Sequence, residues 1–292
     1  MLPKLNKKEL KKILAARKLE DIVIIDSVEK LLVVKRGYIF KMPAPNTPVV
    51  LNVSGGLDST VLWGILMEEY KLVVYPVFFY RGQKRSNREV AAVEYFSHYF
   101  KKRYAKNFKK PAFVNVYIPP KEIRSKITEH SQEPLHEITG ERRGIPLYSA
   151  HLVFNAVQYC TFLELTEKVK IRTIFCSFVR SDGQVLRYET LTAMRILTRT
   201  LCELTSNYEW QVAALALEKE MGFFWDKDVL IKWANERKYP IEKTFSCISN
   251  INYKLHCGEC FFCKYRKLSF QRAEVQDKTK YRKENAISQF FS

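Results

Sequence analysis

The 292-residue chain carries 49 Lys and Arg against 31 Asp and Glu, a formal net charge of +18. Apolar residues make up 47% of it and aromatic residues 13%, which is enough hydrophobic surface to offset chain entropy and excludes disorder for most of the chain. At roughly 150 residues per domain, the length predicts one large domain or a domain with appendages.

Two further classes are disfavoured by the apolar pattern. The longest apolar run, at 72–80, is far shorter than the roughly 20 residues that a membrane helix needs. The basic amino terminus lacks the apolar core of a secretory signal. We therefore expect a cytoplasmic protein without a membrane partner. Four of the seven cysteines crowd between 247 and 263, which in a reducing compartment favours a metal site over disulfides.

The first 47 residues precede the main series of elements. They contain DIVIID at 21–26 and KLLVVKRGYIF at 30–40, both rich in strand-forming residues, and they end in the Pro-rich KMPAPNTP. This composition predicts two strands. Residues 1–47 are accordingly expected to form an added hairpin layer.

From residue 48 onward, short apolar segments alternate with helical patterns, while 119–144 is typical of a loop or insertion. Strands joined through helices favour right-handed crossovers and a Rossmann-like α/β fold, a parallel sheet flanked by helices. In such folds ligands bind beyond the carboxyl ends of the strands. The predicted strands are 49–53, 72–79, 112–118, 171–178 and 210–217, and the predicted helices are 57–70, 86–104, 149–168, 189–205 and 227–238.

The turn after the first of these strands reads SGGLDS, residues 54–59. Two glycines let the backbone approach a ligand closely, and the helix that follows offers free N–H groups and a positive dipole, so the turn is built to hold phosphate. It matches neither G-x-x-x-x-G-K-[ST] nor G-x-G-x-x-G. Asp58 would bind Mg²⁺ or cap the helix; the alternative is a plain strand-to-helix turn with Asp58 as an N-terminal helix charge.

A second motif lies near the carboxyl end. Three cysteines with C-x-x-C-x-x-C spacing share one tight knuckle, and a fourth from a preceding segment completes a tetrahedron, which favours structural zinc. Unliganded buried cysteines and an iron–sulfur cluster remain the alternatives. His256 is not expected to be a ligand, and Cys160, Cys176 and Cys202 are expected in the core. The predicted zinc ligands are Cys247, Cys257, Cys260 and Cys263.

SGGLDS closely resembles the loop of the N-type ATP pyrophosphatases, which adenylate a substrate oxygen and bind the released pyrophosphate. The resemblance implies an adenine nucleotide alpha-hydrolase-like fold, ATP and Mg²⁺ as cofactors, and adenine lying over Val53. It also implies contacts to nucleotide or Mg²⁺ from Val53, Ser54, Gly55, Gly56, Leu57, Asp58, Ser59 and Thr60.

The glycine turn and the C-terminal cysteine segment, taken together, resemble those of the 7-cyano-7-deazaguanine synthases, the QueC family. The matching segments are SGGLDST and SC…HCGECFFCKYRKLSFQRAEVQDKTKY, and the resemblance covers roughly 48–283. It implies a pyrophosphatase domain at 48–245, and a zinc knuckle with a C-terminal helix at 246–292. It also implies Asp58, Ser59 and Lys227 as catalytic residues, with Lys227 contacting phosphate. Further family positions are matched by Gln83, Glu89, Arg266, Phe270, Asp277 and Tyr281.

The chain departs from the family where the acyl substrate should bind. The usual V-P-G-R-N is replaced by IPLYSAH at 145–151, and D-x-x-x-Y-P-D-C-R by SDGQVLRYET at 181–190, in which Asp182 survives clearly. The alternative for the charged residues near this stretch is an ordinary charged surface. The candidate residues for binding the altered substrate are Arg180, Asp182, Arg187 and Glu189.

We therefore expect an ATP-dependent ligase that adenylates 7-carboxy-7-deazaguanine or a related carboxylate, releases pyrophosphate, and forms an amide or nitrile. One alternative is a QueC-like antiviral enzyme that joins the activated deazaguanine to a protein or nucleic acid. Another is a tRNA thiolase, although four cysteines in a closed metal set leave no exposed sulfur carrier. A zinc-dependent nucleic-acid binder without catalysis would leave SGGLDS unexplained. A homodimer is left open.

The basic residues are concentrated in two regions. Residues 81–126 hold 13 basic against three acidic residues, a net of +10, and residues 1–50 hold 11 against five, a net of +6. Such patches attract nucleic acid or other anionic macromolecules; the alternative is a solvated basic face. Because both regions lie outside the two segments most like the family, they favour a macromolecular partner over a role in the chemistry.

Overall fold

The computed structural model describes residues 2–83, 85–118, 120, 122, 147–184, 186–248 and 255–282. Its centre is a five-stranded, fully parallel sheet in the order β3-β2-β1-β4-β5. The central strand pairs on both sides, with Val50 opposite Tyr75 and Ile174. The strands are β1 (Pro48–Asn52), β2 (Val73–Tyr80), β3 (Ala112–Asn115), β4 (Thr173–Cys176) and β5 (Gln211–Ala214).

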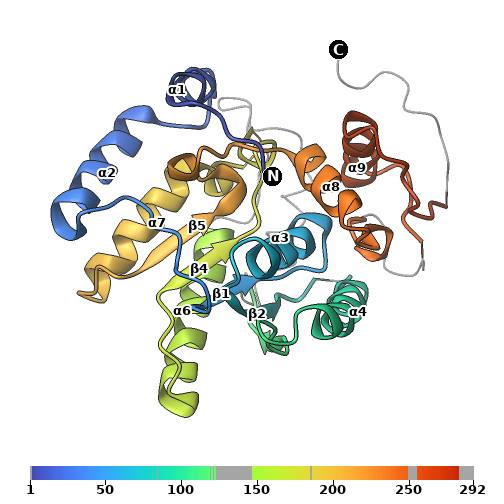
Figure 1. Ribbon diagram of the computed structural model, residues 1–292, viewed down its shortest axis with the longest axis horizontal. Helices are drawn as coiled ribbons and strands as arrows, with labels where there is room; N and C mark the ends of the chain where they lie inside the picture. Colours follow the sequence, from blue (N-terminus) through green and yellow to red (C-terminus); the bar gives the residue numbers. More distant parts are fainter. Residues whose placement is uncertain are drawn as a thin grey trace.

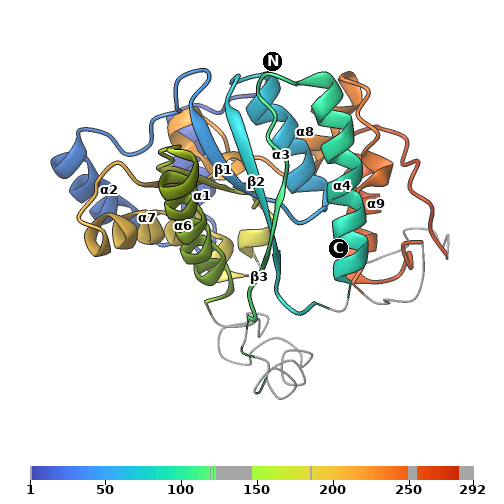
Figure 2. The ribbon, with the colours of Figure 1, turned by 90° about the horizontal axis from the view of Figure 1, so that it is seen from below.

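Helices cover both faces of the sheet, so the predicted parallel α/β fold is confirmed (Figures 1 and 2). Successive strand residues point to opposite faces. Accordingly, Val49 and Leu51 pack under one helical layer, whereas Val50 packs under the other. The first layer consists of α3 (Leu57–Glu68), α4 (Ser86–Arg103), α8 (Lys227–Glu236) and α9 (Phe261–Arg272), and the second contains α6 (Tyr148–Glu167) and α7 (Leu191–Leu204).

Most of the predicted loop at 119–144 lies outside the described residues. Five short 3-10 helices connect the larger elements within the described part of the chain. No helix there is long and apolar enough to span a membrane. The short helices are η1 (Asp182–Gln184), η2 (Arg187–Glu189), η3 (Leu215–Leu217), η4 (Lys219–Met221) and η5 (Ile241–Lys243).

The hairpin predicted for the first 47 residues is wrong, because this segment forms the helices α1 (Lys7–Ala15) and α2 (Ile22–Arg36). Asp21 caps the start of α2 by accepting from the N–H of Ile24 at 3.0 Å, and Gly37, with φ of 81°, ends it. Burial follows the helical repeat and not strand alternation. In Figure 1 both helices lie near α7, and α2 packs against it.

A buried ion cluster fixes α2 to the rest of the molecule. The Arg195 guanidinium in α7 donates to Glu29 of α2 at 2.7 Å and to both carboxylate oxygens of Glu218 at 2.7 and 2.9 Å. Two carboxylates around one guanidinium satisfy charges that would otherwise be costly to bury. The N-terminal helices are therefore an integral part of the α6 and α7 layer.

Candidate active site and cysteine cluster

The turn between β1 and α3 stands at the carboxyl edge of the sheet, and its hydroxyl groups organise its backbone. Ser59 Oγ accepts from the Ser54 N–H at 3.1 Å and donates to the Gly56 carbonyl at 3.3 Å. Ser54 Oγ accepts from the Gly56 N–H at 3.3 Å. The turn is therefore held in place before any ligand arrives, and α3 begins directly behind it, as phosphate binding requires.

Gly55 is at the most crowded point of this turn. Its φ of 72° lies in the left-handed region, and a β-carbon built on it would stand 2.3 Å from the backbone oxygen of Glu89 in α4. Its carbonyl accepts from the Phe245 N–H at 2.8 Å, which connects the turn to the segment leading into Cys247. Only glycine satisfies both the dihedral angle and the space.

Replacing Gly55 by alanine should lower the free energy of unfolding by about 2 to 3 kcal/mol, since the substitution adds left-handed strain to a clash with backbone. Gly37→Ala is the matched control, because Gly37 has φ of 81° and nothing within 4 Å of an added β-carbon. Chemical denaturation of the two variants measures the difference. Equal losses of stability would mean that the approach of α4 does not constrain the turn.

Asp58 and Lys227 form an ion pair over the turn. Lys227, the first residue of α8, places its Nζ 2.5 Å from Asp58 Oδ2 and 3.7 Å from Asp182 Oδ1. The other carboxylate oxygen of Asp58, Oδ1, is buried and has no hydrogen-bond partner among the described residues. A cation and an unsatisfied carboxylate oxygen thus lie beside the same glycine turn.

The carboxyl groups of Asp58, Asp182 and Glu189 all interact electrostatically with Lys227. Burial alone would lower the pKa of Lys227, but the charges of Asp182 and Asp58 raise it, so the ammonium stays charged. Burial and the charge of Asp58 raise the pKa of Asp182 to about 6, against the opposing effect of Lys227. Burial and the charge of Asp182 also raise the pKa of Glu189 well above its ordinary value. A cation placed among these carboxyl groups would lower their pKa values and favour their ionised forms.

Asp226 holds the start of α8, and with it Lys227, in position. The sequence did not reveal this role. Asp226 caps α8 by accepting from the Lys227 N–H at 2.9 Å, and it also accepts from Ser181 Oγ at 2.8 Å and the Tyr265 hydroxyl at 2.6 Å. Burial by itself raises the pKa of Asp226, but these hydrogen bonds bring it below its ordinary value. Arg180 Nε lies 3.9 Å from the other carboxylate oxygen of Asp226, Oδ2.

A second polar network follows β2. Glu89 accepts from Arg81 at 3.0 Å, from Gln83 at 2.7 Å and from Arg85 at 2.5 Å. Arg81 also donates to the hydroxyl of Tyr148 at the start of α6 and lies over its ring. The network ties α4 and α6 together at the carboxyl edge. Gln83 and Glu89 were expected here from the sequence, whereas Arg81 and Tyr148 were not.

The remaining predicted residues divide between the core and the surface. Val53, Leu57 and Thr60 are buried, and Val53 donates its N–H to Val77 in β2 at 2.9 Å. Glu189 belongs to η2 and shares the field of Asp182. Arg187, two residues earlier, is exposed. Asp182 and Glu189 thus share the electrostatic field of Asp58 and Lys227, and Arg180 lies near Asp226, the residue before Lys227.

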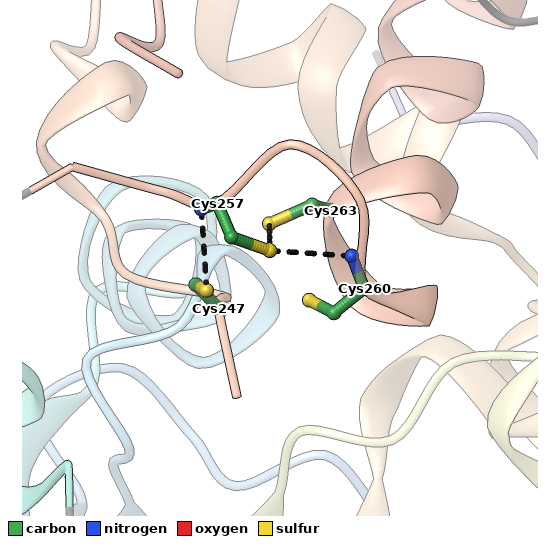
Figure 3. A group of neighbouring side chains, drawn as sticks. All are labelled: Cys247, Cys257, Cys260 and Cys263. Atoms are coloured by element: carbon green, nitrogen blue, oxygen red, sulfur yellow. Dashed lines mark hydrogen bonds between the residues drawn. The ribbon is translucent and has the colours of Figure 1, made fainter. Parts of the chain in front are cut away.

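The four clustered cysteines meet at one point, as Figure 3 shows. Their sulfur atoms all lie within 4.8 Å of one another, and backbone N–H groups point at them: Cys260 donates to Cys257 Sγ at 3.2 Å, and Glu259 donates to the same sulfur at 3.4 Å. The interaction with Cys263 lowers the pKa of Cys260. Four converging sulfurs with N–H donors are a group that could hold a metal ion.

The segment after the cluster returns to support it. The buried guanidinium of Arg266 donates to the Ile241 carbonyl at 2.7 Å and to Thr244 at 2.8 Å, just before Cys247. Asp277 accepts from the Tyr281 hydroxyl at 2.6 Å. His256 is not among the clustered ligands, and its Nε2 accepts from the Ser246 N–H at 3.0 Å. The three other cysteines, as expected, are buried in the core: Cys160, Cys176 and Cys202.

The chain combines a Rossmann-like, parallel α/β sheet with a C-terminal cluster of four cysteines that could hold a metal ion. The chain belongs to the family described as queuosine biosynthesis protein QueC, whose model matches residues 48–274. It is 26% identical over 242 residues to the 7-cyano-7-deazaguanine synthase of Methanocaldococcus jannaschii, covering 78% of this chain and 97% of that protein. For the Methanobrevibacter smithii synthase the identity is 23% over 244 residues, covering 78% and 95%.

Among solved structures, a U34-tRNA thiolase from Methanococcus maripaludis with its [4Fe-4S] cluster matches at a TM-score of 0.34 and 14% identity, covering 87% of this chain and 74% of that one. An NH3-dependent NAD synthetase from Campylobacter jejuni matches at a TM-score of 0.30 and 12% identity, covering 90% and 98%. The family assignment therefore rests on the sequence match.

Proposed function

We propose that the protein uses ATP to adenylate a carboxylate of the 7-carboxy-7-deazaguanine class and then transfers the acyl group to nitrogen. Membership of the QueC family supports the reaction class. The observation that carries the proposal is the pair of Lys227 and Asp58 over a glycine turn at the start of α3. This pair places a fixed cation and an anionic metal ligand where the phosphates of a nucleotide would lie.

The proposed reaction has two steps, adenylation and transfer to nitrogen. An oxygen of the substrate carboxylate attacks the α-phosphorus of ATP, the bond from that phosphorus to the bridging oxygen breaks, and pyrophosphate leaves. Lys227 and the N–H groups at the start of α3 stabilise the charge that develops on the leaving group. The amine nitrogen then attacks the activated carbonyl carbon, AMP leaves, and the nitrogen loses a proton. The product is an amide, and a second ATP would allow its dehydration to a nitrile.

Mg²⁺ suits the site because Asp58 offers a buried, unpaired carboxylate oxygen and the surrounding cluster is acidic. Magnesium ions neutralise phosphate charge when bound. Asp58 is the residue proposed to hold the ion, and Lys227 is proposed to bind the departing pyrophosphate. Ser59 keeps the turn in the geometry that both require, through its hydrogen bonds to Ser54 and Gly56.

For the cysteine cluster we propose one structural zinc ion. Zn–S bonds of about 2.3 Å place the four sulfurs of a tetrahedron about 3.8 Å apart. The limit of 4.8 Å in this chain suits one such ion. A four-iron cluster would stand between the thiolates with its own iron and sulfide atoms and hold them farther apart. The sulfur separation therefore favours zinc over the iron–sulfur alternative.

A macromolecular acceptor of the acyl group is the second candidate. The helices α1 and α2 precede the region matched by the family model, and they adjoin the loop that carries Asp182. Arg17 donates to the Arg180 carbonyl, and Leu5 donates its N–H to Gly222 at 2.8 Å. This places an added basic layer near the catalytic edge, where an acidic protein or nucleic acid could approach. Exposed basic residues of this layer are Lys4, Lys7, Lys8, Lys11, Lys12, Lys18, Lys30 and Lys35.

The test is incubation with ATP, Mg²⁺ and 7-carboxy-7-deazaguanine, with or without ammonium. We expect pyrophosphate and AMP to be released in equal amounts, and only when 7-carboxy-7-deazaguanine is present. Mass spectrometry should detect the amide or nitrile of that compound. Parallel samples with RNA or an acidic protein in place of ammonium test the second candidate by the mass added to the acceptor. If pyrophosphate is not released in any of these mixtures, the proposed function is wrong.

A further inference from the structure

Asn52, the last residue of β1, stands next to the phosphate-binding turn. Its side-chain oxygen and nitrogen are both buried, and neither has a hydrogen-bond partner in the part of the chain that the structure describes. An amide enclosed in this way is unfavourable unless something bonds to it. Its position at the carboxyl end of the central strand is where α/β proteins bind their ligands.

Ser149, in the first turn of α6, shares these properties. It is 1% exposed, and its Oγ is also unpartnered among the described residues. Because strand residues alternate, Asn52 lies on the same face as Val50, the face that α6 covers. Ser149 lies one helical turn before Val153, which packs with Val50 in the core. Both polar side chains therefore occupy the layer above that apolar contact, toward the ligand edge.

Flat groups gather at the start of α6, where Ser149 lies. Tyr148 precedes Ser149 and packs against Tyr188 of η2, with ring centroids 6.3 Å apart. Arg81 lies over the Tyr148 ring with its guanidinium carbon 5.4 Å from the centroid. Burial raises the pKa of both tyrosines, so their hydroxyls stay neutral at physiological pH. Aromatic and guanidinium planes favour a planar ligand.

We propose that Asn52 and Ser149 bind the hydrogen-bonding edge of the planar heterocycle whose carboxylate the enzyme activates, an inference that rests on the proposed function. The Asn52 amide donates to a ring carbonyl and accepts from the neighbouring ring N–H, a complementary pair that a lactam edge supplies. Ser149 Oγ adds a third hydrogen bond. The ligand class is a guanine-like bicycle.

The sheet separates this edge from the ATP phosphates. The turn that follows Asn52 leads into α3, and Leu57 packs in the core on the α3 side. Ser149 belongs to α6 itself, and Asn52 shares the strand face of Val50, which packs on the α6 side. ATP and the acid can thus meet at the carboxyl edge from opposite faces, with the acid read by Asn52. Adenine also carries a donor beside an acceptor, so the experiment must distinguish the two ligands.

The variants Asn52→Leu and Ser149→Ala test the assignment, with 7-carboxy-7-deazaguanine and ATP titrated separately. Each should raise the KM for the acid by about 10- to 100-fold, since a site built to hydrogen-bond a substrate loses that bond. The KM for ATP should stay within about twofold. Asn52→Leu should keep or raise the midpoint of thermal unfolding, because it removes a buried amide without a protein partner. Asn155→Leu on α6 is the control, because the Asn155 amide bonds to His151 within that helix.

The outcomes separate this inference from the function on which it rests. An active wild type whose two variants keep the KM for the acid overturns the inference alone. A raised KM for ATP with an unchanged KM for the acid would also overturn the inference. A lowered unfolding midpoint in Asn52→Leu would do the same, because it would show that the Asn52 amide forms hydrogen bonds within the protein. A wild type that neither binds nor turns over the acid overturns both.

Discussion

Replacing Asp58 by asparagine should slow pyrophosphate release by about a thousandfold or more. The change removes the carboxylate that pairs with Lys227 Nζ at 2.5 Å and the buried oxygen proposed to hold Mg²⁺. Lys227 would then be drawn toward Asp182, 3.7 Å away, and away from the phosphates. A coupled assay of pyrophosphate release, run at saturating ATP and Mg²⁺, measures the effect.

Glu69→Gln provides the matched control. Glu69 directly follows α3, whereas Asp58 lies at its start, and it forms its own 2.5 Å ion pair with Arg237. Removing that carboxylate should leave turnover unchanged, because this end of the helix is remote from the turn. Circular dichroism and metal content should match the wild type in both variants. Full activity in Asp58→Asn would disprove the role assigned to the turn.

Replacing Cys260 by serine should release the metal and lower the unfolding midpoint of the protein sharply. A thiolate is a far better zinc ligand than a hydroxyl, and a structural zinc site contributes binding free energy directly to folding. We expect about one zinc ion per wild-type chain and close to none in the variant. Elemental analysis by mass spectrometry, together with thermal unfolding, measures both quantities.

Cys202→Ser is the corresponding control, since Cys202 is a buried cysteine outside the cluster whose Sγ donates to the Trp210 carbonyl at 3.6 Å. A serine hydroxyl can keep that hydrogen bond, so the metal content should not change. Iron together with inorganic sulfide in the wild type would contradict zinc. A metal-free wild type with undiminished stability would contradict a structural metal of any kind.

The central fold could be predicted from the sequence because each strand and helix carries its own periodicity. The N-terminal helices could not be predicted in the same way. The run IVII at 22–25 is β-branched and favours a strand locally, but Ile25, Glu29 and Leu32 are buried at helical spacing against the rest of the molecule. Asp21 and Gly37 did carry the signals of a helix start and end. Tertiary packing decided between the two sets of signals.

In the candidate site too, features formed within one short segment could be predicted, whereas contacts between distant segments could not. The glycine turn and the four cysteines form motifs within short segments, so the sequence places them. Tyr148 meets Arg81 across 67 residues of sequence, and Tyr265 meets Asp226 across 39, with no motif to mark either pair. Asn52 could not be identified from the sequence either. A polar residue at the end of an apolar strand indicates a binding role only when its side chain is known to be buried.

The hydrogen bond from Phe245 to Gly55 has a consequence for the timing of maturation. Its two residues are about 190 positions apart, so a ribosome adding roughly 5 to 20 residues per second needs about 10 to 40 s to make the second after the first. The glycine turn is synthesised early, but it gains this hydrogen bond only after the segment leading into the cysteine cluster has been made. A nascent or truncated chain would therefore contain the SGGLDS motif without the finished geometry of the turn.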